Sequence, residues 1–136
     1  MVREIVKDQF FLAQKSLPAG PEDLAVGQDL LDTLRANREG CVGLAANMIG
    51  VKKCIIAFTD GEAETVLYNP VILKGSGPYV TQEGCLSLPG QRKARRWKKI
   101  RLQFQNESFQ LRVKTYEGYT AQIIQHELDH CAGILI

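Results

Sequence analysis

Apolar residues recur at helical spacing in two stretches of the chain. Residues 22–38 carry an apolar stripe along one side of a predicted helix, and it consists of Leu24, Leu30, Leu31 and Leu34. Glu22 and Asp23 favour the start of this helix, and Gly40 is suited to cap its end. A second helix is expected over about residues 119–131. We expect the first helix to pack on the core.

Alternation of polar and apolar residues predicts β-strands between the two helices. The clearest pair is residues 98–105 and 108–115, which alternate on both sides of a short turn and predict a hairpin. We expect Phe109, Leu111 and Val113 to face inward. Residues 64–68 and 71–74 should be two strands separated by a break at Asn69-Pro70, and further short strands are expected at residues 53–58 and 79–82.

Residues 41–50 follow neither pattern, because they are small and apolar and include glycine at positions 43 and 50. Small residues permit the close approach of another backbone or of a ligand. From these residue types alone we favour packing against a neighbouring strand.

The length of 136 residues predicts one domain, residues 1–136, with a single core. Apolar residues make up 45% and charged residues 24%, which is ordinary for a soluble globular protein. No apolar run approaches the roughly 20 residues of a membrane span, and the first residues contain no secretion signal. We therefore expect a cytoplasmic protein with no membrane contact, whose four scattered cysteines are reduced thiols.

The candidate chemistry lies in Gln125-His126-Glu127-Leu128-Asp129-His130, which holds both histidines of the chain. Two histidines four residues apart lie on the same face of a helix, with Cβ atoms roughly 5–6 Å apart, so both imidazoles can bind one metal ion. Glu127 points about 100° away from His126. The pattern is typical of a metal-activated water with a carboxylate base, although two unrelated surface histidines are the alternative.

A third metal ligand is expected because two histidines leave a metal short of partners. The best candidate is Cys85, in a segment that runs from Glu83 to Gly90 and contains glycine and proline. Three protein ligands leave a position open for water, as in catalytic sites. Taken alone, Cys85 would more often be a small buried apolar residue.

Three segments together resemble the motifs of the peptide deformylase family. Those motifs are Gly-x-Gly-Leu-Ala-Ala-x-Gln, Glu-Gly-Cys-Leu-Ser and Gln-His-Glu-x-Asp-His, and the chain matches them in order at residues 41–48, 83–87 and 125–130. The resemblance implies an α+β fold, in which antiparallel strands wrap around a central helix that carries both histidines. It also implies a metal-dependent hydrolase that removes the N-formyl group from the N-terminal methionine of newly made proteins.

The substrates implied by this resemblance are N-formylmethionyl peptides or nascent chains. The implied cofactor is one divalent metal ion, natively Fe²⁺, with Zn²⁺, Ni²⁺ or Co²⁺ as substitutes, and a thiolate with two imidazoles is acceptable to all four. Two alternatives remain open. One is a divergent deformylase-like protein with weak activity or another N-acyl substrate, and the other is a metal-binding module without catalytic activity.

The resemblance also implies roles for individual residues. The metal ligands would be Cys85, His126 and His130. Glu127 would take a proton from the metal-bound water, whose pKa the metal lowers, and return it to the leaving amine. The backbone N–H of Leu86 would stabilise the oxyanion.

Further residues are implied to support the site or to line it. Gly43 and Glu83 would support the site, with Glu83 pairing to either Arg95 or Arg96. Asp129 would lie next to the ligands or on the surface of the helix. The methionine pocket is expected to include Gln122 and Ile123.

The chain departs from the family pattern at two positions of the first motif. Met48 stands where the family has the glutamine that donates a second hydrogen bond to the oxyanion, and a thioether cannot donate. Loss of one such donor typically lowers kcat by roughly 10²–10³. Asn47 or a water molecule could supply the missing donor. Cys41 replaces a glycine, and it would be strained if its φ angle were positive.

Two further surfaces could bind partners. Residues 92–101, from Arg92 to Arg101, hold seven of the seventeen basic residues and no acid. Because the net charge of the whole chain is +2, the rest of the chain has a net charge of −5. This stretch could contact ribosomal RNA, bind the substrate through Arg92, or be a solvated strand edge. The apolar end Ile134-Leu135-Ile136, if exposed, could pack on a second copy and form a homodimer.

Overall fold

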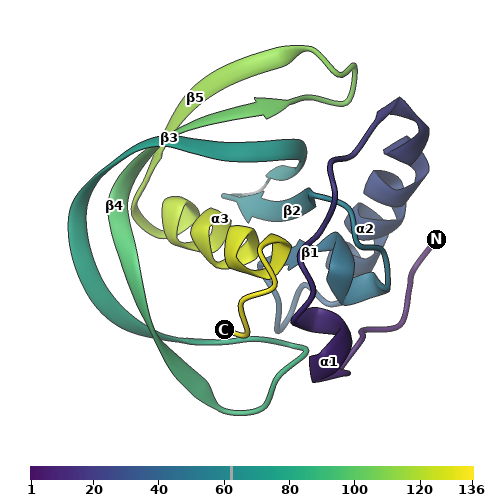
Figure 1. Cartoon of the computed structure of the whole chain (residues 1–136), viewed down its shortest axis with the longest axis horizontal. Helices are drawn as coiled ribbons and strands as arrows, with labels where there is room; N and C mark the ends of the chain where they lie inside the picture. Colours follow the sequence, from purple (N-terminus) through teal and green to yellow (C-terminus); the bar gives the residue numbers. More distant parts are fainter. Residues whose placement is uncertain (62) are drawn as a thin grey trace.

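Long, strongly curved strands wrap around one helix in the computed structural model of the protein, which describes residues 1–61 and 63–136 (Figure 1). Within these residues one antiparallel sheet has the order β1-β2-β3-β4-β5. Its strands are β1 (Gly43–Ala45), β2 (Ile55–Asp60), β3 (Ala63–Gly84), β4 (Gln91–Gln105) and β5 (Leu111–Glu117). The helix inside the curve is α3 (Gly118–Cys131), so the expected α+β arrangement is confirmed.

The expected break at Asn69-Pro70 is wrong, because β3 continues through it for 22 residues. Asn69 adopts a φ of 52°, and the pairing with β4 shifts register between Tyr68 and Val71. At a register shift the ladder of hydrogen bonds between two strands is already irregular, so the strand can continue although proline has no N–H to donate. Three of the expected short strands are therefore segments of one long strand.

The register of β5 also differs from the expectation for its side chains. Leu111 and Val113 are 60% and 45% exposed, so they do not face inward. Tyr116 does face inward, opposite the buried Ile100 of β4. Because side chains alternate along a strand, the pairing of Tyr116 places the odd-numbered residues outside. Phe109 lies in the turn, where it packs on Tyr68 with 4.9 Å between ring centroids.

The expected helix in the first third of the chain is α2 (Leu24–Ala36), which follows the short 3-10 helix η1 (Pro21–Asp23). Leu30 and Leu34 are fully buried, as the stripe predicts, whereas Leu24 is 40% exposed and Leu31 is only partly buried, so the stripe is confirmed in part. The helix ends at Ala36, with Asn37 as its cap, so Gly40 is not the cap. The remaining helices are α1 (Gln9–Leu12) and η2 (Ala46–Ile49).

α3 is buried on most of its surface, including its polar residues. Gln125 is an example, because its amide pairs with both backbone groups of Trp97: Oε1 accepts from N at 2.7 Å and Nε2 donates to O at 2.8 Å. The pairing of β4 with β5 starts only at Lys99, so Gln125 bonds to the part of β4 that has no strand on that side. This contact fixes α3, which carries both histidines, against the sheet.

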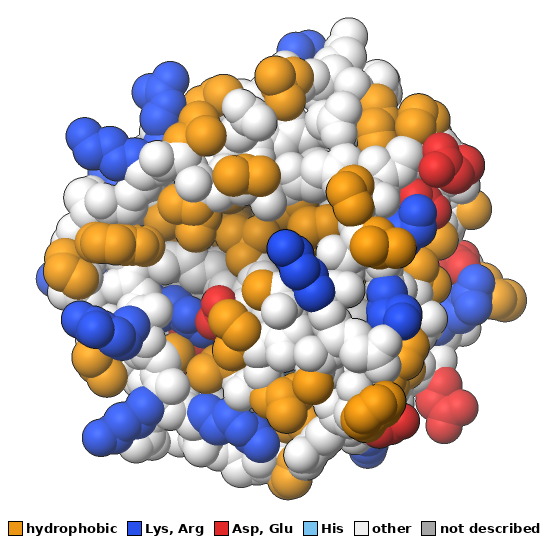
Figure 2. Space-filling model, viewed as in Figure 1, with side chains coloured by type: hydrophobic (Ala, Val, Ile, Leu, Met, Phe, Trp, Pro, Cys, Tyr) orange, Lys and Arg blue, Asp and Glu red, His pale blue; other side chains and the backbone are white. Residues whose placement is uncertain are grey.

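The basic stretch lies on β4, which begins at Gln91 rather than at the expected residue 98. Figure 2 shows Lys and Arg side chains gathered along the left edge of the molecule, over β3 and β4. One of the seven basic residues, Arg96, points inward and is buried, whereas the exposed ones are Lys93, Arg95, Lys98, Lys99 and Arg101.

At the C-terminal end, Ile136 is only 6% exposed and Ile134 is 49% exposed, so the end is not a continuous exposed apolar segment. In the described part of the chain, no helix has the length and apolar character that crossing a membrane would require.

Candidate metal centre and catalytic pocket

The structure brings together the three residues expected to bind a metal. His130 Nε2 lies 3.2 Å from His126 Nε2 and 3.3 Å from Cys85 Sγ, and all three ligand atoms lie within 4.8 Å of one another. The two histidines come from adjacent turns of α3. Cys85 is the first residue after β3, and its thiol lies beside His130 of α3.

The donor set fits a divalent transition metal. One soft thiolate and two imidazole nitrogens suit Fe²⁺, Co²⁺, Ni²⁺ and Zn²⁺, and three protein ligands leave a position open. Glu127 Oε1, a buried atom beside the cluster, has no hydrogen-bond partner among the described residues. Such an atom is typical of a site that is completed by an ion or by water.

Glu83, at the end of β3, fixes the orientation of His126. Its Oε1 accepts from His126 Nδ1 at 2.7 Å, so the Nε2 atom of this ring is left for the cluster. Arg96 donates to both oxygens of Glu83, at 2.7 and 2.9 Å, and Gln122 Nε2 donates to Oε2 at 3.0 Å. The partner of Glu83 is therefore Arg96 and not the exposed Arg95.

The surroundings of Glu83 keep it ionised. Burial raises its pKa, but the hydrogen bonds from His126, Arg96 and Gln122 outweigh burial and bring the pKa to about 2. Arg96 also donates from Nη1 to Asp129 Oδ2 at 2.8 Å. The carboxylate of Asp129 is thus part of an ion-pair network behind the ligands, which resolves the two alternatives for this residue.

Glu127 lies on the pocket side of α3, where burial raises its pKa to about 7. The neighbouring residue that makes room for it is Gly43. A Cβ atom on residue 43 would lie 2.9 Å from Glu127 Oε2 and 2.7 Å from Ile123 Cγ2, closer than side chains tolerate. The small residue of the first motif therefore allows the carboxylate to lie against the backbone of β1.

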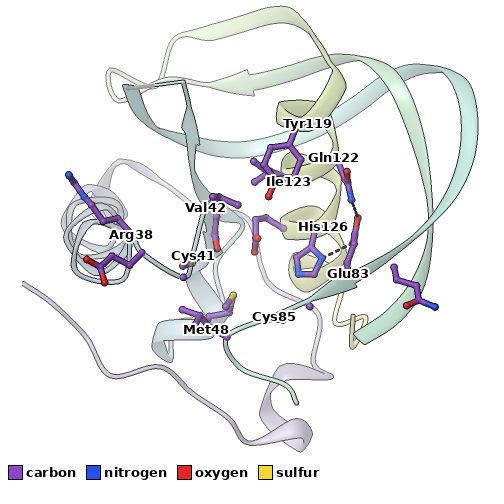
Figure 3. Close-up of a pocket in the computed structure, with 17 residues that line it drawn as sticks. Arg38, Cys41, Val42, Met48, Glu83, Cys85, Tyr119, Gln122, Ile123 and His126 are labelled. Carbon is purple, nitrogen blue, oxygen red and sulfur yellow. Dashed lines mark hydrogen bonds and ion pairs between the residues drawn. The ribbon is translucent and has the colours of Figure 1, made fainter. Parts of the chain in front are cut away.

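A cavity of about 630 Å³ opens beside the cluster and extends to the surface. Figure 3 shows Tyr119, Gln122, Ile123 and His126 of α3 on one side of it and Met48 across from them. Gln122 and Ile123 line this cavity, as expected for the methionine pocket. The site therefore combines a cluster of side chains that could hold a metal ion, a buried carboxylate and a pocket that can hold a side chain.

Leu86 also lines the cavity, directly after Cys85. Its backbone N–H makes no hydrogen bond to any described residue, so it is available as a donor. The next N–H along the chain, that of Ser87, points to Cys85 Sγ at 3.4 Å. Such an N–H group stabilises a thiolate.

Met48 and Asn47 are both buried, but only Met48 faces the cavity. The thioether sulfur of Met48 accepts from the backbone N–H of Ala45 at 3.5 Å. The amide of Asn47 donates instead to the backbone carbonyl of His130 at 2.8 Å. Asn47 thus bonds to the end of α3 and does not replace the missing donor in the cavity.

Cys41 lines the cavity without backbone strain, since its φ angle is not among the positive ones in the described residues. Its thiol donates to the carbonyl of Gly43 at 3.1 Å, and burial raises its pKa to about 12. Cys41 is not part of the metal-binding group found in the described residues.

The contacts at the site that were not expected from the sequence include those of Gln122 with Glu83 and of Asn47 with His130. Gln122 could have been found, because it lies four residues before His126 and hence on the same helix face. Asn47 could not, since only the fold brings η2 against the end of α3.

Comparison with known proteins gives one consistent result. A sequence model of the family described as polypeptide deformylase matches residues 3–136. The chain is 54% identical over the full length of both proteins to a peptide deformylase of Clostridium beijerinckii, and 38% identical to peptide deformylase 2 of Clostridium acetobutylicum over 91% of this chain and 85% of that one.

Solved structures agree with these matches. A class I type b peptide deformylase from Acinetobacter baumannii, solved with Met-Ala-Ser bound, superposes with a TM-score of 0.88 at 25% identity, covering 99% of this chain and 97% of that one. The peptide deformylase of Thermotoga maritima superposes with a TM-score of 0.87 at 28% identity, covering 99% and 94%.

Proposed function

The chain belongs to the polypeptide deformylase family, and we propose that it works through a divalent metal ion held by Cys85, His126 and His130. Members of this family are metal-dependent hydrolases, and the reaction of this chain is removal of the N-formyl group from the N-terminal methionine of newly made proteins. The observation that carries the proposal is the convergence of the three ligand atoms within 4.8 Å beside a buried carboxylate and an open cavity.

We propose Fe²⁺ as the native ion and Zn²⁺, Ni²⁺ or Co²⁺ as substitutes. The soft thiolate of Cys85 and the imidazoles of His126 and His130 support a divalent transition metal, because the set suits all four ions. A bound divalent ion supplies two effects, a lower pKa of water and polarisation of a carbonyl group.

The role proposed for Glu127 is proton transfer. Hydrolysis of the formamide adds water to the formyl carbon and breaks the bond between that carbon and the amine nitrogen. One proton must leave the attacking water, and one must reach the departing nitrogen. Glu127 can carry the same proton between them, because its carboxylate lies in the cavity beside the cluster, where burial raises its pKa.

Stabilisation of the oxyanion is proposed for the backbone N–H of Leu86, which lines the cavity next to Cys85. The formyl oxygen gains charge when water adds, and a fixed N–H donor offsets that charge. Met48 cannot assist, since a thioether has no hydrogen to donate. This chain therefore has one side-chain donor fewer than the family pattern.

The cavity lined by Ile123, Gln122 and Tyr119 is proposed to receive the methionine side chain of the substrate. It lies beside the cluster and the Glu127 carboxylate. The Acinetobacter deformylase was solved with Met-Ala-Ser bound, which makes formyl-Met-Ala-Ser a suitable test substrate.

The experiment that tests the proposal compares wild type with Glu127→Gln. Formate release from formyl-Met-Ala-Ser and bound metal are measured on the same samples, purified without oxygen and loaded with Fe²⁺. We expect Glu127→Gln to keep its metal and to lose at least about 10²-fold in kcat. Equal turnover of both proteins would show that Glu127 does not transfer the proton.

We further propose that β4 contacts the ribosome, in the cytoplasm, where nascent chains appear. Support comes from the exposed cations on this strand, which can bind RNA phosphates. The test is co-sedimentation of ribosomes with a variant in which Arg95, Lys98 and Lys99 are neutralised. A control variant neutralises three exposed lysines outside β4, namely Lys7, Lys15 and Lys52. Unchanged binding of the β4 variant would refute the contact.

A further inference from the structure

Asn47 and His130 each have one buried polar atom without a partner. The atoms are Asn47 Oδ1 and His130 Nδ1, and neither finds a hydrogen bond in the described part of the chain. Both residues are 0% exposed. A buried amide oxygen and a buried ring nitrogen normally have partners, so two such atoms on neighbouring residues indicate a common cause.

The two residues are already joined through their other polar atoms. Asn47 Nδ2 donates to the backbone carbonyl of His130 at 2.8 Å, across 83 residues of sequence. Asn47 lies within η2, whose four residues are all buried. The free oxygen of Asn47 is thus held next to the residue that carries the free nitrogen.

The ring of His130 presents its other nitrogen to the cluster. Nε2 faces both Cys85 Sγ, at 3.3 Å, and His126 Nε2, at 3.2 Å. When Nε2 of a neutral imidazole binds a metal, the ring proton is on Nδ1, which then becomes a donor. His130 therefore needs a buried acceptor on its Nδ1 side, as His126 has in Glu83.

We propose that Asn47 is the positioning residue for His130. Its N–H group holds the end of α3 through the His130 carbonyl, and its Oδ1 accepts the Nδ1 proton when the ring binds a metal ion. This inference rests on the proposed role of His130 as a ligand. The pair of tasks explains the residue type, because an amide offers a donor and an acceptor at once, whereas leucine offers neither and aspartate only an acceptor.

The arrangement makes the two ligand histidines unequal. His126 donates to an ionised carboxylate that Arg96 and Gln122 hold in place. His130 would donate to a neutral amide. Since Asn47 precedes Met48 in η2, one short turn provides both the support of a metal ligand and a wall of the cavity.

The test measures Co²⁺ affinity of metal-free protein by competition with a chelator, for wild type, Asn47→Leu and Asn47→Asp. We expect Asn47→Leu to bind Co²⁺ about 10–100-fold more weakly, as is typical when the partner of a ligand histidine is removed. Asn47→Asp keeps the acceptor and should retain affinity within about threefold of wild type. A second readout is the His130 Nδ1 proton in NMR spectra of Zn²⁺-loaded protein, which should exchange slowly in wild type and rapidly in Asn47→Leu.

A matched control is Thr33→Val, which removes another fully buried polar group, the hydroxyl that donates to the Asp29 carbonyl. It should lower thermal stability and leave Co²⁺ affinity unchanged. Wild-type affinity in Asn47→Leu, or equal losses in Asn47→Leu and Asn47→Asp, would overturn the inference while leaving the proposed function intact. Failure of wild type itself to bind Co²⁺ would overturn both.

Discussion

The backbone of Gly43 lies directly against the carboxylate of Glu127. A Cβ atom on residue 43 would lie only 2.9 Å from Glu127 Oε2, and it would also lie 2.7 Å from Ile123 Cγ2. Both side chains belong to the buried part of α3, so neither can move aside freely. The φ angle of Gly43 is not in the left-handed region, so the requirement for glycine here is one of space and not of backbone conformation.

Gly43→Ala should therefore displace the Glu127 carboxylate and lower kcat by about 10²-fold, since misplacing a catalytic group by about 1 Å has an effect of this size. Steady-state kinetics of formate release measures the change. Gly40→Ala is the matched control, because a Cβ atom on Gly40 meets nothing within 4 Å. If Gly43→Ala kept wild-type kcat, the contact with Glu127 would have no catalytic importance.

Met48→Gln should raise kcat by up to about 10²-fold. The sulfur of Met48 now accepts from the N–H of Ala45. A glutamine oxygen can take over that hydrogen bond, which leaves the glutamine N–H₂ group directed into the cavity as the second oxyanion donor. Kinetics with formyl-Met-Ala-Ser tests this expectation.

Met48→Leu separates the donor from the packing at this position. Leucine fills a similar volume but neither donates nor accepts, so kcat should stay near that of wild type while the thermal midpoint falls slightly. A Met48→Gln variant no faster than Met48→Leu would mean that the Leu86 N–H and the metal ion already stabilise the oxyanion fully.

Arg96→Leu should lower the free energy of unfolding by about 3–5 kcal/mol, because it leaves the buried carboxylate of Glu83 without its cation. Arg96 also pairs with Asp129 at 2.8 Å, so two anions lose their partner. Arg95→Leu, one residue earlier and exposed, should change the value by no more than about 0.5 kcal/mol. Urea unfolding of both variants measures the difference, and equal effects would contradict the assigned pairing.

Alkaline pH should destabilise the protein through Tyr116. Burial, with a smaller contribution from Asp60, raises the pKa of this phenol from 10.0 to about 12. Because the folded state holds the proton more tightly than the unfolded state, the stabilisation is complete below pH 10 and is lost as pH rises toward 12. Relative to Tyr116→Phe, wild type should lose about 1.4 kcal/mol of unfolding free energy per pH unit in this range. Parallel curves for the two proteins would refute the shift.

The three candidate metal ligands could be predicted from the sequence because they lie in two short segments. His126 and His130 are brought together by one turn of helix, and the motif that contains Cys85 needs only the end of a strand to reach them. The choice between Arg95 and Arg96 could not be made from the sequence. It depends on which face of β4 points inward, and this is set by pairing with β3.

The strands were predicted less well, because their pattern depends on partners that are distant in sequence. Pro70 indicates a break in an isolated segment, yet the register shift beside it lets β3 continue. Leu111 and Val113 have the alternation of an inward face, but the pairing of Tyr116 with Ile100 places them outside. Asn47 carries no sequence signal, since its partner His130 lies 83 residues away.

The most direct test of the central claim is a metal titration of metal-free protein. Increasing Fe²⁺ is added without oxygen, and formate release from formyl-Met-Ala-Ser and bound iron are measured at each step, for wild type and for Cys85→Ser. We predict that wild-type turnover rises in proportion to bound iron and levels off at about one ion per chain, while Cys85→Ser binds iron weakly and gains little activity. Turnover that is independent of iron, or equal in the two proteins, would contradict the assignment of Cys85, His126 and His130 as the metal site of a deformylase.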